Sequence, residues 1–415
     1  MKKTAISTKK RNVLFLLVDC LRADRCWGDG RTVVTPAINS LFERGTVFTQ
    51  AISSATVTTS SVSSIFTGLY PFQHGVRALR GYKLRSKCLT MAEIFKKNRF
   101  QTYAEVSGPL FPELGFDRGF DVYNYRDKKH NVHSKWGDTL LTRFEGFKEP
   151  WFFFVHFWAL HRPRQVLKEM DNKKYGKNEY DRAVSSLDDY LGRLLKKVDD
   201  NTILIFNSDH GEKMLSRIER LKYRLRSYRY YRWLERKINK YAEMNIDHGF
   251  HVFDYLVRVP LILVGKNIFP EGKIIESQVR QIDILPTLLD ALDFKGKIEV
   301  EGRSLMPLIN GSSMNELPAY CVANKIPNDK KKWLRGIRTS DYKYVYTPYD
   351  QNMPEELYDL RSDPQEKKNI ISEKPGIAQS LREQLVKIYV EANKKESALA
   401  DEEKMKKRLE ELGYW

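Results

Sequence analysis

Short, continuous apolar runs alternate along the chain with segments whose apolar residues recur at helical spacing. The runs Val13–Val18, Trp151–Phe157 and Ile203–Phe206 are rich in β-branched and aromatic residues, which is typical of strands buried on both faces. Between the last two runs, Ala183, Leu187, Leu191 and Leu194 line one side of a predicted amphipathic helix. The pattern predicts an α/β fold in which helices cover an open sheet.

Residue types that can bind metals stand at the ends of two of the predicted strands. Asp209 and His210 come after the strand that begins at Thr202, and Asp19 comes after the first strand. Open α/β sheets place their sites at the carboxyl ends of strands, where side chains from several strands meet. A carboxylate beside an imidazole favours a transition-type metal over magnesium. The alternative for each aspartate is a cap on the following turn, and for an isolated Asp-His-Gly the two interpretations are equally good.

A segment crowded with hydroxyl groups, residues 53–75, leads into another predicted helix. Val62, Ile65 and Phe66 face the core, and Gly68 ends the helix. A helix amino terminus presents unpaired N–H groups and a positive dipole, so it suits an oxyanion and activates a hydroxyl placed there. The more common role of such a segment is helix capping, so it favours a catalytic site only in combination with the metal ligands.

The composition of the chain limits which binding partners and which cellular compartment are expected. The chain has 415 residues and is 41% hydrophobic, enough for one large core and a smaller second domain. Its net charge of +18 predicts an anionic partner. No apolar run is long enough to span a bilayer, and the first run is too short for a secretion signal. Four cysteines show neither metal-type pairing nor a disulfide framework, so we expect a reducing cytoplasm: Cys20, Cys26, Cys88 and Cys321.

The strings VDCLRAD, TTSSVSSIFTGLYPFQHGV, SDHGE and HGFHVFDYLVRVPLILVG occur in this order along the chain. Together with further matches between residues 10 and 393, they resemble the sulfatase branch of the alkaline phosphatase superfamily. The resemblance implies a large mixed, mostly parallel sheet flanked by helices, followed by a small α+β subdomain. The expected divisions are a catalytic domain over 1–310, the subdomain over 311–393 and a charged tail over 394–415.

Counting back from the TG that ends the family's nucleophile motif places the nucleophile at Thr58, with neighbouring hydroxyl residues leaving the frame open by about one position. Sulfatases have a Cys or Ser there that is oxidised to formylglycine, and the motif's Pro and Arg are replaced here by Ser60 and Val62. Formylglycine formation is therefore not expected. A Thr in this place resembles the family's phosphodiesterase and phosphotransferase members, which favours a phosphate ester as substrate.

The resemblance also implies that Asp19, Asp209, His210 and Thr58 surround one divalent cation. The family's sulfatases hold calcium with a second aspartate directly after the first, and this chain has Cys20 in that position. With a histidine among the ligands, manganese or zinc is favoured, calcium remains an option and a second metal is left open.

Two histidines resemble the family's groups on the substrate side. His161, in HRP, and His248 would neutralise the anionic group or protonate the leaving oxygen. His251 is a rival for the role of His248. His156, within the apolar run, is interpreted as a packed core histidine.

An insertion over 213–246 separates SDHGE from HGFHVF and predicts one or two basic amphipathic helices. Such helices would act as a lid, hold an anionic polymer or lie on a lipid surface, which would place the protein at the inner face of the membrane. The alternative is a helix whose apolar side packs on the domain. Nucleic acid is not an expected partner, because nothing in the chain is suited to read bases.

Three functions are consistent with these features. The first is a metal-dependent hydrolase of sulfate or phosphate esters that acts on an anionic glycan or a lipid-linked substrate. The second is a phosphoethanolamine-type headgroup transferase. The third is a non-catalytic polyanion-binding homologue, against which the retention of three metal ligands argues.

Overall fold

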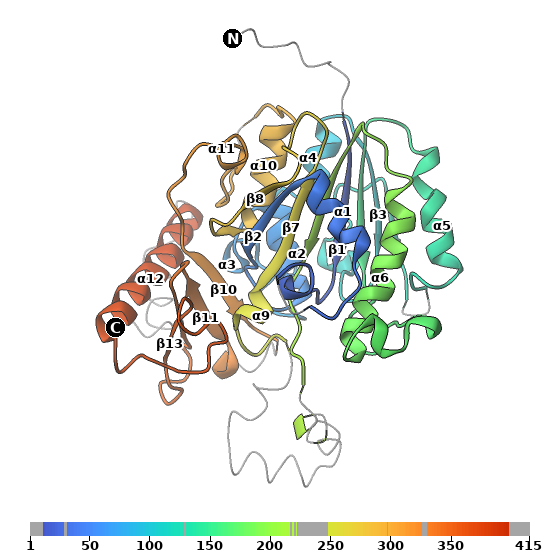
Figure 1. The fold of residues 1–415 in the computed structure, drawn as a ribbon. Coiled ribbons are helices and arrows are strands. Elements are labelled where there is room, and N and C mark those ends of the chain that lie inside the picture. Colours follow the sequence, from blue (N-terminus) through green and yellow to red (C-terminus); the bar gives the residue numbers. More distant parts are fainter. Residues whose placement is uncertain are drawn as a thin grey trace.

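The computed structural model describes residues 11–28, 31–127, 130–215, 218, 219, 221, 248–296, 298–325 and 330–397. Their main feature is a nine-stranded sheet with the order β4-β3-β5-β1-β6-β7-β2-β8, in which β9 also pairs with β2 (Figure 1). Only β7 runs antiparallel to its neighbours, so the sheet is mixed and mostly parallel. The strands are β1 (Asn12–Val18), β2 (Thr46–Ile52), β3 (Gln101–Val106), β4 (Val122–Tyr125), β5 (Trp151–Phe157), β6 (Thr202–Ser208), β7 (Arg258–Val264), β8 (Lys273–Ile275) and β9 (Val279–Arg280).

Alternate residues of the central strands face two separate cores. In β1, Val13, Phe15 and Leu17 pack in one core, while the residues between them pack in the other. The first core is covered by α2 (Thr58–Thr67), α4 (Met91–Lys97) and α10 (Ile284–Ala291). The second is covered by α1 (Pro36–Arg44), α5 (Lys135–Arg143) and α6 (Glu179–Leu195). Every residue of β1, β5 and β6 is buried, which confirms strands covered on both faces.

The local sequence explains where several helices begin and end. Pro36 begins α1, where its missing N–H costs no hydrogen bond, and Gly45 follows the last residue of that helix. Gly68 ends α2 at a φ of +65°, the left-handed conformation that glycine adopts without strain. The inward residues predicted for α6 are all buried. Short helices α3 (Pro71–His74), α9 (Asp254–Val257) and α11 (Met306–Ile309) lie in the connections.

A second, four-stranded antiparallel sheet follows the large one. It has the order β10 (Ala319–Ala323), β11 (Leu334–Arg338), β12 (Tyr342–Tyr346) and β13 (Glu356–Asp359), and α12 (Pro375–Ser397) packs on it (Figure 1). The predicted fold class, with a small α+β unit at the C-terminal end, is confirmed. The domain limits at 310 and 393 remain predictions. Most of the predicted helical insertion, including 222–247, and the tail beyond 397 lie outside the described residues.

Candidate active site

The register of the central strands brings the predicted metal ligands together. β1 and β6 are parallel neighbours that pair Val18 with Ser208, so the next residues, Asp19 and Asp209, leave the sheet side by side. His210 follows Asp209. One oxygen of each carboxylate and one nitrogen of the imidazole lie within 4.8 Å of one another, and all three side chains are fully buried.

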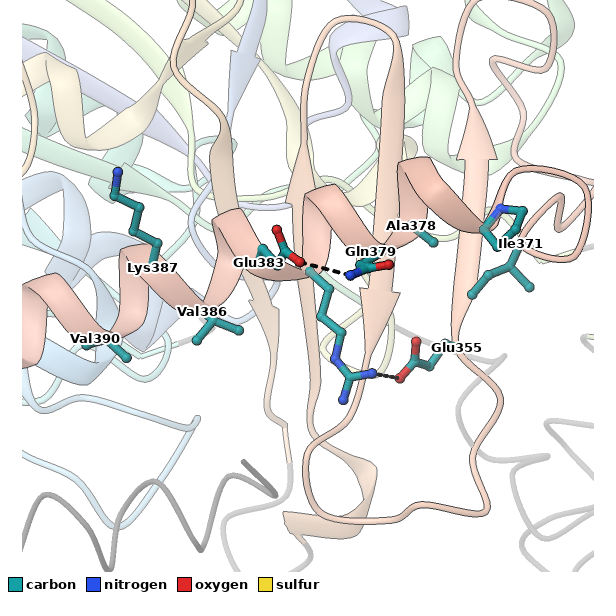
Figure 2. A pocket seen from close by; sticks show the side chains of 10 residues that line it. Glu355, Ile371, Ala378, Gln379, Glu383, Val386, Lys387 and Val390 are labelled. Atoms are coloured by element: carbon teal, nitrogen blue, oxygen red, sulfur yellow. Dashed lines mark hydrogen bonds and ion pairs between the residues drawn. The ribbon is translucent and has the colours of Figure 1, made fainter. Parts of the chain in front are cut away.

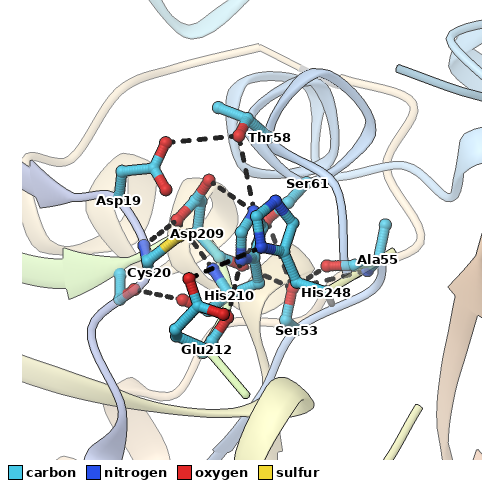
Figure 3. Close-up of polar contacts among 12 residues, drawn as sticks. Asp19, Cys20, Ser53, Ala55, Thr58, Ser61, Asp209, His210, Glu212 and His248 are labelled. Carbon is cyan, nitrogen blue, oxygen red and sulfur yellow. Dashed lines mark hydrogen bonds and ion pairs between the residues drawn. The ribbon is translucent and has the colours of Figure 1, made fainter. Parts of the chain in front are cut away.

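Thr58 lies at the first position of α2 and points into this group (Figure 3). Its Oγ1 donates to Oδ2 of Asp19 at 3.3 Å and lies 3.4 Å from Nε2 of His210. Only 2% of the residue is exposed. The helix amino terminus adds a positive electrostatic potential at the hydroxyl, which is where an anionic group would be held.

The two buried carboxylates and the imidazole give the site a charge and a geometry that suit a cation. Burial, and then the charge of Asp209, raises the pKa of Asp19 well above its usual value. Oδ1 of Asp19 and Oδ2 of Asp209 accept no hydrogen bond from the described residues, although both are buried. His210 donates from Nδ1 to the carbonyl of Gly211 at 2.9 Å, which leaves the lone pair on Nε2 facing the carboxylates. Two oxygens and one nitrogen directed at one point therefore fit a divalent cation.

Hydrogen bonds fix the backbone that carries these ligands. The carbonyl of Asp209 accepts from the hydroxyls of Ser53 at 2.6 Å and Ser61 at 2.7 Å. Its carboxylate accepts from the backbone N–H groups of Cys20 at 3.2 Å and His210 at 2.8 Å. Because Ser61 belongs to α2, these contacts also tie the helix that carries Thr58 to the strand end.

The two histidines predicted on the substrate side lie next to the ligand group. The ring of His248 stacks on that of His210 with centroids 4.6 Å apart, and His161 lies 5.6 Å from His248. Trp158 stacks on His161 at 4.2 Å. His251 instead pairs with Glu356 of the small sheet at 2.9 Å. The structure thus brings all six predicted site residues together and leaves the rival histidine outside.

Sequence reasoning assigned no catalytic or ligand role to two other side chains near the site. Glu212 is only 1% exposed, and its carboxylate lies 3.8 Å from Nδ1 of His248 and 3.7 Å from Nη2 of Arg162. His156 is fully buried, as predicted, but its Nε2 also lies 3.8 Å from Oδ2 of Asp19. Burial lowers the pKa of His156 to about 4, so it is neutral near pH 7. In the sequence, the feature that could have placed Glu212 near the site is its position two residues after His210.

The small sheet reaches the site through β10. Val322 pairs with the segment before Thr58, accepting from Thr56 N–H at 3.0 Å. Next to β10, Asn324 donates to the hydroxyl of Ser60 at 3.3 Å, and Lys325 N–H donates to the carbonyl of Gly249 at 3.0 Å.

A separate groove lies between α12 and the segments that carry Glu355 and Ile371 (Figure 2). Ala378, Val386 and Val390 are among its apolar lining residues, and Arg382 pairs there with Glu355 at 3.3 Å. None of its lining residues belongs to the site around Thr58, so we do not assign it to the chemistry.

Comparison with known families agrees with this arrangement. The Sulfatase family matches residues 11–294, which is more than half of the chain. The chain belongs to the sulfatase family. A second match, to the C-terminal region of N-sulphoglucosamine sulphohydrolase, covers residues 246–393.

Relatives of this sulfatase-family chain span nearly its whole length. An "Ulvan-active sulfatase" from Formosa agariphila is 24% identical over 93% of this chain and 80% of its own. The structure of a phosphonate monoester hydrolase of Agrobacterium radiobacter superposes with a TM-score of 0.69 and 19% identity, covering 92% of this chain and 96% of that one. A structure from Bacteroides thetaiotaomicron glycosaminoglycan metabolism gives 0.71 with 17% identity, covering 93% and 97%. The two structural likenesses show the shared fold.

Proposed function

We propose that this protein is a metal-dependent hydrolase of phosphate or sulfate esters in which Thr58 is the nucleophile. The observation that carries the proposal is the position of the Thr58 hydroxyl, 3.3 Å from Asp19 and 3.4 Å from His210, beside two buried carboxylate oxygens that accept no hydrogen bond from the described residues. A non-catalytic binding protein has no need for a buried hydroxyl at that point. Threonine cannot become formylglycine, which favours a phosphate ester over a sulfate ester.

The residues suggest how such a reaction would proceed. A divalent cation held by Asp19, Asp209 and His210 would stabilise the ester oxygen and make the Thr58 hydroxyl more acidic. The Thr58 hydroxyl would lose its proton to solvent, and its oxygen would form a bond to phosphorus or sulfur while the bond to the leaving oxygen breaks. His161 and His248 would donate a proton to that leaving oxygen or neutralise the remaining oxygens. Water would then release the covalent intermediate and regenerate the hydroxyl.

An anionic glycan is the substrate class that we favour. Relatives of the chain are named as an ulvan-active sulfatase and a Δ4,5-hexuronate-2-O-sulfatase, and both names specify a carbohydrate substrate. The net charge of +18 suits a polyanion or an acidic lipid headgroup. In the described residues, no helix has both the length and the apolar character needed to cross a bilayer. Membrane contact through 213–246 and a cytoplasmic location stay predictions.

The test is hydrolysis of an aryl phosphate monoester, a phosphodiester and an aryl sulfate by ion-stripped protein resupplied with manganese, zinc or calcium. We expect cleavage of a phosphate ester that requires both the ion and Thr58. Thr58→Ala should abolish it, and the matched control Thr58→Ser, which keeps a hydroxyl, should retain part of it. If no ester is cleaved while an ion is bound, the transferase and non-catalytic alternatives take precedence.

A further inference from the structure

The proposed reaction makes no use of the Cys20 thiol, although it lies at the site. Its Sγ, one nitrogen of His210 and one nitrogen of His248 all lie within 4.8 Å of one another, and all three side chains are buried. Figure 3 shows the sulfur beside the Asp209 carboxylate. Sulfur and two imidazole nitrogens form a ligand set that is chemically distinct from the two carboxylates and one nitrogen described above.

The backbone holds Cys20 in an unusual conformation. Its φ is +63°, in the left-handed region that residues with a side chain rarely adopt. Two hydrogen bonds hold the residue in place: its N–H donates to Asp209 at 3.2 Å, and its carbonyl accepts from the hydroxyl of Tyr180 at 2.7 Å. Strain of this kind persists only where the surroundings fix it, and it is concentrated at functional sites. The direction of the thiol is therefore set by the fold.

His210 belongs to both ligand sets and limits how they can be used. Because Nδ1 donates to the carbonyl of Gly211, Nε2 carries the only free lone pair of the ring. One lone pair binds one metal ion. The two sets therefore cannot be filled at the same time through His210.

We propose that Cys20, His210 and His248 form a soft-metal site that competes with the catalytic cation for His210. The inference rests on the proposed function for the identity of the cation that is displaced. Thiolate and imidazole ligands favour soft ions such as cadmium, whereas the carboxylate set accepts harder ions such as manganese. Binding breaks the S–H bond of Cys20, forms a sulfur–metal bond and releases the proton to solvent.

Occupation of this site has a defined consequence for catalysis. The soft ion removes His210 from the carboxylate set and His248 from the leaving group, so the protein is inhibited although Thr58 is intact. A hard ion supports the reaction, and a soft ion at similar concentration stops it.

The test is titration of ion-stripped protein with cadmium, followed by the ultraviolet charge-transfer absorption of a cadmium–thiolate bond. We expect the absorption to saturate at one equivalent, to disappear in Cys20→Ser and to persist in Cys26→Ser, a matched control whose thiol is equally buried. His248→Ala keeps Cys20 and its turn, and should weaken cadmium binding by roughly tenfold or more. Absorption that persists in Cys20→Ser would overturn the proposal.

Manganese supplies the second part of the test. Protein loaded with manganese should release the ion in proportion to the cadmium bound. The released manganese is measured by the electron paramagnetic resonance spectrum of the free ion. Cadmium that binds without releasing manganese would refute competition for His210. Failure of the proposed function is separate, because Thr58→Ala should lose hydrolysis and still give the cadmium–thiolate absorption. If Thr58→Ala keeps hydrolysis, the proposed nucleophile is wrong and the thiol site is unaffected.

Discussion

Four charged side chains form a buried network between α9 and the small sheet, and we predict that Lys343→Met breaks it. Lys343 is fully buried and donates to Asp254 at 2.6 Å, Glu366 at 2.7 Å and the carbonyl of Val252 at 3.0 Å. Arg338 donates twice to Asp254, each time at 2.9 Å. Two cations and two carboxylates balance one another, and methionine leaves one negative charge in excess.

The expected loss follows from these contacts. Each hydrogen bond between charged groups contributes about 1.5–3 kcal/mol, and Lys343 makes two of them. Methionine has a similar length and leaves little empty volume, so we expect the free energy of unfolding to fall by about 3–5 kcal/mol, as for other buried pairs that lose one partner. Burial raises the pKa of Glu366, and the charge of Lys343 acts against that rise.

Without the lysine, the pKa of Glu366 rises further. Protonated Glu366 stabilises the variant fully below its unfolded pKa, about 4.5. That contribution is lost as the pH rises through the folded value, so the penalty should be larger at pH ~8 than at pH ~5. Urea unfolding followed by tryptophan fluorescence measures it at both pH values. Lys374→Met is the control: its side chain is 40% exposed, and it should not shift the midpoint. A penalty below about 1 kcal/mol, or one equal at both pH values, would refute the reasoning.

Three further predictions concern the site and its surroundings. Asp209→Asn removes one of two adjacent buried carboxylates, so thermal melts should show a more stable ion-free protein that no longer gains stability from manganese; an unchanged gain would exclude Asp209 as a ligand. Burial lowers the pKa of His74 to about 3. Its contribution to stability is complete above pH ~6.5 and is lost as pH falls toward 3, by about 2 kcal/mol at pH 5, and His74→Gln should flatten this dependence in urea unfolding. Gly108→Ala places a methyl group 2.2 Å from the ring of Trp158 at a φ of +70°. It should displace the indole from His161 and lower kcat/KM without changing metal binding, and an unchanged kcat/KM would contradict this.

The candidate metal ligands could be predicted from sequence because they follow buried strands directly. Asp19 and Asp209 each come directly after a buried strand, and parallel strands end at the same edge of a sheet. Thr58 could not be found in this way. The hydroxyl-rich segment before α2 has the composition of an ordinary helix cap, and the family resemblance was needed to choose one hydroxyl among several.

Contacts between distant segments could not be predicted from the sequence. The closeness of His156 to Asp19 depends on β5 lying next to β1, and hydropathy gives strands without their order in the sheet. The same holds for the antiparallel direction of β7. Asn324 and Ser60 are 264 residues apart, and neither carries a pattern that points to the other.

The two residues that follow β10 contact both sides of the site, and these contacts affect how related chains can be recombined. Asn324 contacts α2, which carries the proposed nucleophile, and Lys325 contacts Gly249, the neighbour of a proposed acid. A crossover between relatives near residue 310 would therefore exchange two supports of the reaction centre together with the outer sheet. A fragment that ends near residue 310 would carry every proposed catalytic side chain without the Asn324 and Lys325 contacts that hold their surroundings in place.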